Sequence, residues 1–173
     1  MYLLHRGRLL LFMALVMLGI LATAAAPVGA TNIYVDPDQQ FAIGVADGWT
    51  QRAPDTDGVV ALWSVDGGRA IFNVVREHVP YGTSNEAYAR ANIDGVSSFS
   101  GYTEIRRDYV TCADQDCPIL DYTAYDDNGE LQRVQQVFVT KGSDGYVLTY
   151  RTRASDAERY RSDVELMVYS FSL

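Results

Sequence analysis

An unbroken apolar run near the amino terminus decides which part of this chain is available to fold as a domain. The run extends from Leu9 to Ala26. Basic residues precede it and small residues follow it, namely His5, Arg6 and Arg8 before the run and Val28-Gly29-Ala30 after it. This layout is typical of a secretory signal peptide with its cleavage site. We therefore expect a signal segment over residues 1–30 and one globular domain over residues 31–173.

An uncleaved signal segment is the alternative that the sequence leaves open. The apolar run has about 18 residues, near the lower limit for crossing a bilayer. No second apolar stretch of spanning length follows it. In this alternative, residues 9–26 anchor the domain in a membrane. Both alternatives place the domain outside the cytoplasm.

The charge of the expected domain is strongly negative. Arg6 and Arg8 leave with the signal segment, so 12 of the 14 basic residues remain against 22 acidic ones, and the net charge becomes −10. A surface of this sign repels phosphate backbones, which argues against nucleic acid as a partner. The charge names no partner by itself, because it also serves solubility.

Cys112 and Cys117 are the only cysteines in the chain. In an oxidising compartment, a close pair of this kind favours a disulfide, here across a tight turn between two strands. A metal site is the alternative. Two thiolates supply only half of a tetrahedral zinc site, and only His78 can add an imidazole. We expect the disulfide and no bound metal.

Alternating apolar residues and turn signals predict strands over most of the domain. Gly-rich and Asn-Gly segments such as Asp66-Gly67-Gly68 and Asp126-Asp127-Asn128-Gly129 separate the strands as turns. The segment 41–50 is expected to begin as a half-buried strand, to turn at Asp47-Gly48 and to return to the core at Trp49. The other predicted strands cover residues 33–36, 59–66, 69–78, 104–112, 118–126, 131–140 and 145–153.

Two segments change to helical spacing, one over residues 84–98 and one at the end of the chain. Each follows a capping-box pair, namely Thr83 with Glu86 and Ser155 with Glu158. The expected buried stripes are Tyr88, Ala91, Val96 and Phe99 in the first helix, and Tyr160, Val164, Met167, Val168 and Phe171 in the second. Several strands carry apolar residues on both faces, so we expect both faces of an antiparallel sheet to be covered.

Known catalytic motifs are missing from the sequence. The expected domain contains one histidine, His78, and it lacks a nucleophile elbow, a P-loop and a dinucleotide-binding motif. Carboxylates are plentiful, but most fall in predicted turns, where Asp accepts hydrogen bonds from nearby backbone N–H groups. The sequence therefore predicts no catalytic residue and no cofactor, and a carboxylate-based hydrolase stays as an alternative.

Two segments resemble the PsbP-like group of proteins. The early FAIGVADGW resembles the group's opening strand, which runs into Gly-Trp, and the late GYVLTY with a helix ending in Ser170-Phe171 resembles its closing elements. The matching residues are framework positions: Phe41, Ile43, Gly48, Trp49, Tyr146, Leu148, Tyr150 and Phe171. The sequence departs from the pattern at one position, because Ala46 or Asp47 stands where the group usually has proline.

This resemblance implies an α+β fold, an α/β/α sandwich in which a mid-chain helix and a carboxy-terminal helix pack on a central antiparallel sheet. It also implies a fold used for docking rather than for catalysis. We therefore expect an exported, non-enzymatic binding or accessory module that docks to an envelope or extracellular partner, either a protein or a small ligand. The alternatives are a carboxylate-based hydrolase and a carrier that holds a small apolar ligand between sheet and helix.

Overall fold

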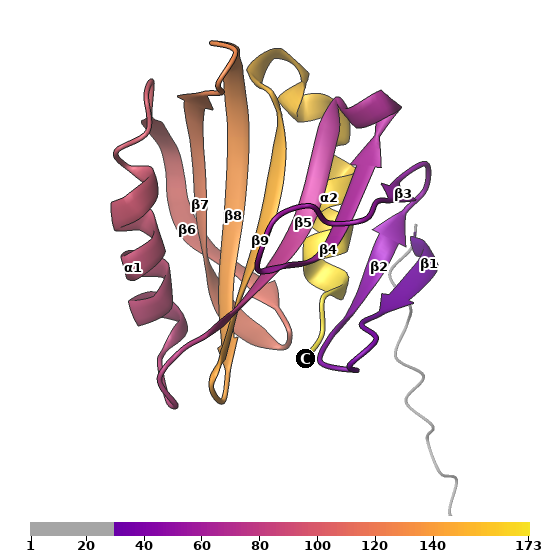
Figure 1. Cartoon of the computed structure of the whole chain (residues 1–173), viewed down its shortest axis with the longest axis vertical. Coiled ribbons are helices and arrows are strands. Elements are labelled where there is room, and N and C mark those ends of the chain that lie inside the picture. Colours follow the sequence, from indigo (N-terminus) through magenta and orange to yellow (C-terminus); the bar gives the residue numbers. More distant parts are fainter. Residues whose placement is uncertain (1–29) are drawn as a thin grey trace, which may run out of the picture.

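A seven-stranded antiparallel sheet forms the centre of the molecule in a computed structural model, which describes residues 30–173 (Figure 1). Its spatial order is β3-β4-β5-β9-β8-β7-β6. The strands are β3 (Thr50–Gln51), β4 (Val59–Val65), β5 (Ala70–His78), β6 (Thr103–Cys112), β7 (Gln115–Tyr125), β8 (Leu131–Lys141) and β9 (Asp144–Arg153). Apart from Ala30, the signal segment predicted for residues 1–30 lies outside the described residues.

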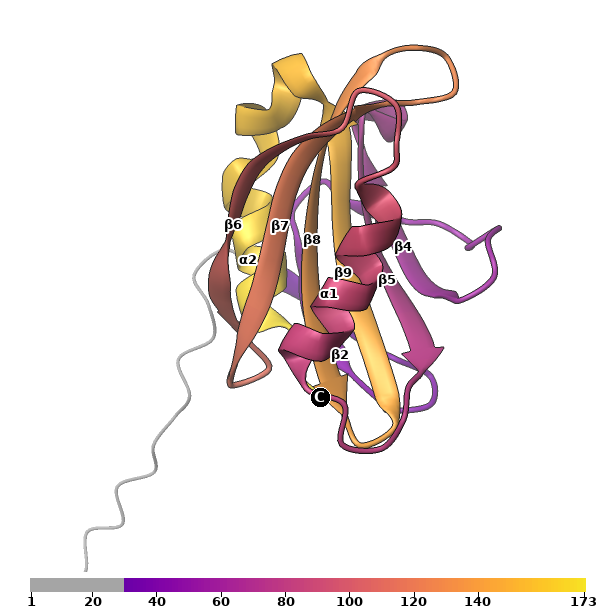
Figure 2. The same cartoon turned by 90° about the vertical axis from the view of Figure 1, so that its left-hand side faces the viewer.

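Two helices cover opposite faces of this sheet (Figure 2). They are α1 (Asn85–Val96) and α2 (Arg161–Ser170), and a second sheet of β1 (Ala30–Val35) and β2 (Ala42–Ala46) packs beside α2. Short 3-10 helices are η1 (Asp66–Gly68) and η2 (Ala154–Tyr160). The predicted α+β sandwich is therefore confirmed. Within the described range, no helix has the length and apolar character needed to cross a bilayer.

The order of the strands makes β6 an edge of the sheet. β4 and β5 form a hairpin, and the chain then passes through α1 to the far side of the sheet. From there β6, β7, β8 and β9 return as an antiparallel meander, and β9 pairs with β5. Because β6 is the first strand of this meander, only β7 pairs with it among the described strands.

The capping boxes predicted for the helices are wrong. In α1 the N-cap is Ser84, whose Oγ accepts the backbone N–H of Ala87 at 3.2 Å. The Thr83 hydroxyl donates instead to the carbonyl of Pro80 at 2.7 Å. The segment after Ser155 winds as the 3-10 helix η2, and no side chain caps α2. One residue of displacement is enough to remove a capping bond, because the bond needs one backbone geometry.

The buried stripe predicted for α1 is partly wrong. Tyr88, Ala89 and Ile93 are buried, whereas Ala91 and Phe99 are exposed. The buried face of the helix is displaced by about one residue from the predicted one. Because apolar residues are spread around this helix, its sequence does not show clearly which face is buried. In α2, by contrast, the predicted stripe is buried throughout: Tyr160, Val164, Met167, Val168 and Phe171.

The larger core lies between the sheet and α2. Phe171 stacks on Phe41 with ring centroids 5.4 Å apart, and it contacts Tyr146 at 5.9 Å. Trp49 lies edge-on to Tyr160 and donates its Nε1–H to Asp163 Oδ2 at 3.0 Å. The residues that carried the family resemblance are buried in this core, namely Phe41, Ile43, Trp49, Tyr146, Leu148, Tyr150 and Phe171.

A smaller core lies between the sheet and α1. Tyr88 packs edge-on against Phe138, and its hydroxyl donates to Glu77 Oε2 at 3.0 Å. The ring of Tyr88 lies directly over Gly145 of β9, where an added Cβ would come within 2.7 Å of the ring. Glycine at this position therefore allows α1 to approach the sheet.

We expect Gly145→Ala to lower the free energy of unfolding by about 1–3 kcal/mol, because the new methyl group displaces Tyr88 and loosens α1. Urea unfolding followed by circular dichroism measures this change. Gly95→Ala is the matched control, since a Cβ at this exposed helical position meets nothing within 4 Å. It should stabilise the protein by about 0.5–1 kcal/mol. Equal effects of the two substitutions would contradict this account.

Candidate functional site

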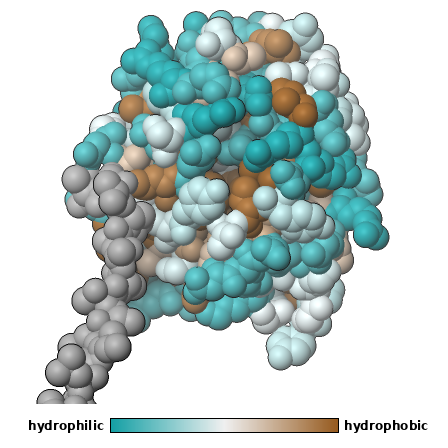
Figure 3. Space-filling view, turned by 180° about the vertical axis from the view of Figure 1, so that it is seen from behind, coloured by the Kyte–Doolittle hydropathy of each residue, from teal (hydrophilic) through white to brown (hydrophobic). Residues whose placement is uncertain are grey.

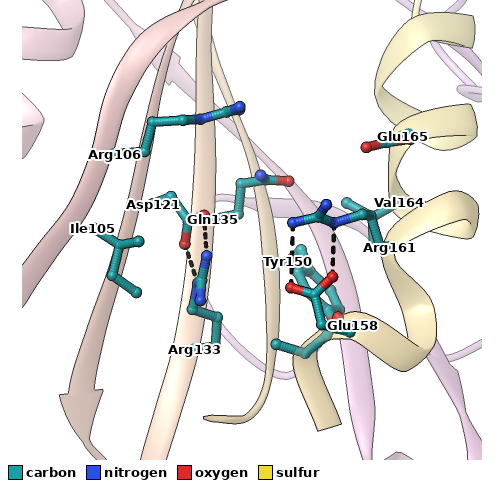
Figure 4. Close-up of a pocket in the computed structure, with 11 residues that line it drawn as sticks. Ile105, Arg106, Asp121, Arg133, Gln135, Tyr150, Glu158, Arg161, Val164 and Glu165 are labelled. Carbon is teal, nitrogen blue, oxygen red and sulfur yellow. Dashed lines mark hydrogen bonds and ion pairs between the residues drawn. The ribbon is translucent and has the colours of Figure 1, made fainter. Parts of the chain in front are cut away.

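The described part of the chain has a polar hollow on the α2 face, between the strands β6, β7 and β8 and the segment formed by η2 and α2 (Figure 4). Its volume is about 350 Å³. The hollow is lined by Ile105, Arg106, Asp121, Arg133, Gln135, Tyr150, Ala157, Glu158, Arg161, Val164 and Glu165. Three arginines and three carboxylates thus converge on one side of an otherwise apolar layer.

The floor of the hollow is an ion pair between neighbouring strands. Arg133 of β8 donates from Nε and Nη2 to the two carboxylate oxygens of Asp121 of β7, with an Nη2–Oδ2 distance of 2.6 Å. The side chains are only 10% and 22% exposed for Asp121 and Arg133 respectively. These hydrogen bonds raise the pKa of the Arg133 guanidinium. Because charges so far from water are costly unless paired, each side chain depends on the other.

The helical wall carries a second ion pair that is far more exposed. Arg161 Nε lies 3.1 Å from Glu158 Oε2, and both side chains are more than half exposed. Exposed pairs of this kind contribute little to stability. Behind them, Tyr150 of β9 is buried, and this burial raises its pKa.

Two further charged residues face the hollow without an ion pair within residues 30–173. Arg106 extends from β6 and Glu165 from α2, so they point toward the space from opposite walls, with the amide of Gln135 between them (Figure 4). Both residues also line a second hollow of about 170 Å³, together with Tyr109 of β6 and Tyr169 of α2. We call the two connected hollows the β6–α2 groove.

Exposed apolar side chains border the β6–α2 groove. Ile105 is 46% exposed, Tyr109 55% and Tyr169 59%. Figure 3 shows this face of the molecule, where apolar residues gather among hydrophilic ones. An arrangement of exposed aromatic residues beside unpaired charges is suited to binding a partner, because tyrosine combines an apolar ring with a polar tip.

The cysteines predicted to form a disulfide lie at one end of the groove. Cys112 ends β6, Cys117 lies in β7, both are buried, and their sulfur atoms are 2.6 Å apart as thiols. The turn between them is held to the end of α2, because Ala113 N–H donates to the carbonyl of Phe171 at 2.9 Å. The hairpin that carries β6 and the helix that faces it are therefore connected beside this cysteine pair.

The other polar residues considered in the sequence do not gather at the groove. His78 is exposed at the end of β5. The Asp126 carboxylate accepts hydrogen bonds from the backbone N–H groups of Asn128 and Glu130, both at 2.9 Å, as expected for a turn. In the range that the structure describes, no group of three His, Cys, Asp or Glu side chains is placed to hold a metal ion.

Sequence reasoning missed the residues of the groove. A usable signal was present at Asp121, which interrupts the apolar run of the strand Pro118–Tyr122. A carboxylate inside such a strand needs a cationic partner. Arg133 supplies it from a diagonal position on β8, where it pairs with Thr123 while Gln135 pairs with Asp121. Arg106 and Glu165 gave no comparable signal, because exposed charges are common and only the fold brings these two together.

No family model matches this sequence, and no curated protein matches it. Solved structures match its fold. A protein of Bacteroides thetaiotaomicron has a TM-score of 0.61 at 11% identity, over 83% of this chain but only 48% of its own length. Cyanobacterial PsbP (CyanoP) from Synechocystis sp. PCC 6803 has a TM-score of 0.60 at 15% identity, over 82% of this chain and 91% of CyanoP.

A third match extends the same fold to a eukaryotic protein. The Ran-binding protein Mog1p of Saccharomyces cerevisiae has a TM-score of 0.57 at 12% identity, over 81% of this chain and 93% of Mog1p. The chain therefore has the PsbP-like fold, as the resemblance of its FAIGVADGW and GYVLTY segments predicted. At these identities the likeness concerns the fold alone.

We expect Asp121→Ala to lower the free energy of unfolding by about 3–5 kcal/mol, because it leaves the Arg133 guanidinium buried without a counter-charge. Urea unfolding at neutral pH measures the loss. The double variant Asp121→Leu with Arg133→Met should recover most of it, since it removes both charges together. Glu158→Ala is the control, because it removes the exposed ion pair with Arg161. It should lower the free energy of unfolding by less than about 1 kcal/mol. A double variant as unstable as Asp121→Ala would contradict this account.

We expect the protein made in an oxidising compartment to contain a Cys112–Cys117 disulfide. Thiol titration under denaturing conditions should then find no reactive thiol. Replacing both cysteines by alanine should lower the free energy of unfolding by about 2 kcal/mol, the value for closing so short a loop. The unsubstituted protein measured with a reductant should match the double variant. Two titratable thiols in freshly isolated protein would contradict the prediction.

Proposed function

We propose that this protein is an extracytoplasmic, non-enzymatic binding module and that the β6–α2 groove holds its partner. The observation that carries the proposal is the pairing of unneutralised charges with exposed apolar side chains in one groove. Arg106 and Glu165 have no ion pair within the described residues, and Ile105, Tyr109 and Tyr169 border the same space. A bound partner would satisfy the charges and cover the apolar surface together.

The hydrogen bonding of the groove favours binding over hydrolysis. A carboxylate-based hydrolase needs two carboxyl groups that can hand over or receive a proton or attack the substrate. Here Arg133 occupies both oxygens of Asp121, and Arg161 lies against Glu158. Glu165 is the one carboxylate of this groove that is not engaged by an arginine. One unengaged carboxylate does not make the pair that this chemistry requires.

A protein partner and an extracytoplasmic location are supported by independent observations. Mog1p, which has a similar fold, is named a Ran-binding protein, so this fold can present a surface to another protein. The pattern of residues 1–30 favours export, by cleavage or as an anchored domain. Because fold alone does not determine function, the groove rather than the fold carries the choice of binding surface.

Carriage of a small ligand is the second candidate, and a separate hollow on the α1 face favours it. This hollow has a volume of about 350 Å³, and Phe99, Tyr122 and Tyr125 line it together with Arg151. Asp126 and Asp127 line the same hollow, so its aromatic walls suit a small apolar ligand without a negative charge. An uncharged fluorescent hydrocarbon probe should then bind to the native protein and fail to bind to Ala124→Trp, which fills the hollow from β7.

Site-specific photo-crosslinking in the producing cell tests the binding function. A photoreactive phenylalanine analogue replaces Tyr109 or Tyr169 on the groove, or Tyr81, which is 88% exposed outside it, as the control. We expect one discrete crosslinked species from each groove position and none from the control. Adding Gln135→Trp, which fills the groove, should remove these species. No crosslink at either groove position, or equal crosslinking at Tyr81, would refute the proposal.

A further inference from the structure

We propose that the partner binds as an extended segment that adds an antiparallel strand to the outer edge of β6 and directs alternate side chains into the β6–α2 groove. This inference rests on the proposed function, because it takes the groove as the binding site. It adds the backbone geometry of the partner and the pattern of residues that the groove would select.

The first support is the free edge of β6. β6 has ten residues, and β7 is its only partner strand within residues 30–173. The opposite edge strand, β3, has two residues. In an antiparallel sheet, every second residue of an edge strand directs its N–H and C=O groups outward, where they are free to pair with another strand. β6 is therefore the long hydrogen-bonding edge of this sheet.

The second support is the helix beside this edge. Residues of β6 and of α2 line the groove together, including Arg106 and Tyr109 from the strand and Val168 and Tyr169 from the helix. An added strand would thus have the backbone of β6 on one side and side chains of α2 against one of its faces. An edge strand with a neighbouring groove is the arrangement by which protein domains capture extended peptides, with backbone bonds giving affinity and side-chain pockets giving specificity.

The pairing of β6 with β7 defines which charges an added strand would meet. A bulge interrupts the pairing at Ile105, and the pairing is regular from Arg106 to Cys112. Arg106 pairs with Asp121 and Asp108 pairs with Ile119. Asp121 lines the groove and Ile119 belongs to the α2-side core, so Arg106 and Asp108 both face α2.

Arg106 and Asp108 select a charge pattern in the partner. Neither has an ion pair in the described part of the chain, whereas Arg107, on the other face, is held by Glu104 at 2.6 Å. In an antiparallel strand, the residue opposite Asp108 comes two positions before the residue opposite Arg106. The complementary segment therefore has a basic residue, any residue, and then an acidic residue. Opposite charges directly across two strands stabilise the pair.

The aromatic side chains extend this pattern toward the amino terminus of the partner. Tyr109 and Val110 of β6 lie next to Asp108, and Tyr169 of α2 lines the same hollow. Two apolar residues placed before the basic one would lie opposite Val110, on the face toward α2, and opposite Tyr109, on the other face. The groove thus favours a segment with two apolar residues, a basic residue, any residue and an acidic residue, in this order.

A second copy of the chain fits the edge less well. Two antiparallel β6 strands related by a two-fold axis place a central residue opposite its own copy. A register centred on Arg106 or Asp108 places identical charges opposite each other on the α2 face, which is unfavourable. A register centred on Arg107 pairs Arg106 of each copy with Asp108 of the other, but it places Glu104 rather than an apolar residue opposite Val110. The apolar positions of the pattern, rather than the charges alone, therefore favour a partner of different sequence, and a dimer through β6 is one of the outcomes tested below.

The experiment uses the synthetic peptide acetyl-TVVKTETS-amide as the probe and the protein as isolated from the producing cell, labelled with nitrogen-15. Two control peptides are used. In the first, TVVETKTS, the two charges are exchanged. In the second, alternate backbone nitrogens of TVVKTETS are methylated, which removes the N–H donors needed for strand pairing. The changes in backbone amide chemical shift during titration with each peptide give the affinity. Amide hydrogen exchange shows which backbone N–H groups form new hydrogen bonds. We expect saturable binding with slower exchange in residues 106–111, at least tenfold weaker binding of the exchanged peptide, and no binding of the methylated peptide.

A charge-exchanged protein provides the matched variant. Arg106→Asp with Asp108→Arg changes two exposed side chains, so the fold should persist, and circular dichroism checks this. This variant should prefer TVVETKTS over TVVKTETS by a similar factor. The inference is overturned if no peptide binds at millimolar concentration, if the charge order has no effect, or if residues 106–111 gain no protection.

The two proposals can fail separately. Crosslinks from Tyr109 and Tyr169 in the cell, without protection of residues 106–111 by peptide, would retain the groove as the binding site and refute strand addition. Protection of β6 that appears without peptide and rises with protein concentration, together with a dimer in analytical ultracentrifugation, would also refute it, because a second copy would then occupy the edge.

Discussion

The packing of Phe171 against Phe41 and Tyr146 positions the whole α2 face of the molecule. This contact fixes the end of α2 on the sheet, and the following residue extends it, since Ser172 and Ala42 exchange two backbone hydrogen bonds of 2.9 Å. The Phe171 carbonyl also accepts the N–H of Ala113 in the β6–β7 turn. One aromatic cluster thus places the helix that forms one wall of the groove and the hairpin that forms the other.

The groove exists because polar residues occupy places where the rest of this layer is apolar. A leucine and a methionine at positions 121 and 133 would extend the core toward the edge of the sheet. The protein has instead an ion pair that is costly to bury and needs both partners. Beside it, Arg106 and Glu165 carry charges that no partner within the described residues neutralises. These two unneutralised charges are the basis of the proposed binding site.

Much of the fold was predictable from local patterns, and most of the site was not. Period-two alternation and turn residues gave the strands, and the buried stripe of α2 was visible at helical spacing. The predicted caps of both helices and the predicted buried face of α1 were wrong. The first cap is displaced by one residue, and the segment after Ser155 forms a 3-10 helix before α2 begins at Arg161. Asp121 carried a local signal, a carboxylate within an apolar strand. Arg106 and Glu165, nearly sixty positions apart in the chain, carried none.

The sequence by itself determined the antiparallel sheet, the presence of two helices and the resemblance to PsbP-like proteins, because these follow from side-chain periodicity and from core residues such as Phe41 and Trp49. Only the tertiary structure decided that β6 is an edge strand and that α2 lies beside it. Strand order depends on which hairpin packs next to which, and this is set by contacts between distant segments rather than by any local pattern. The groove, and every function inferred from it, depends on that order.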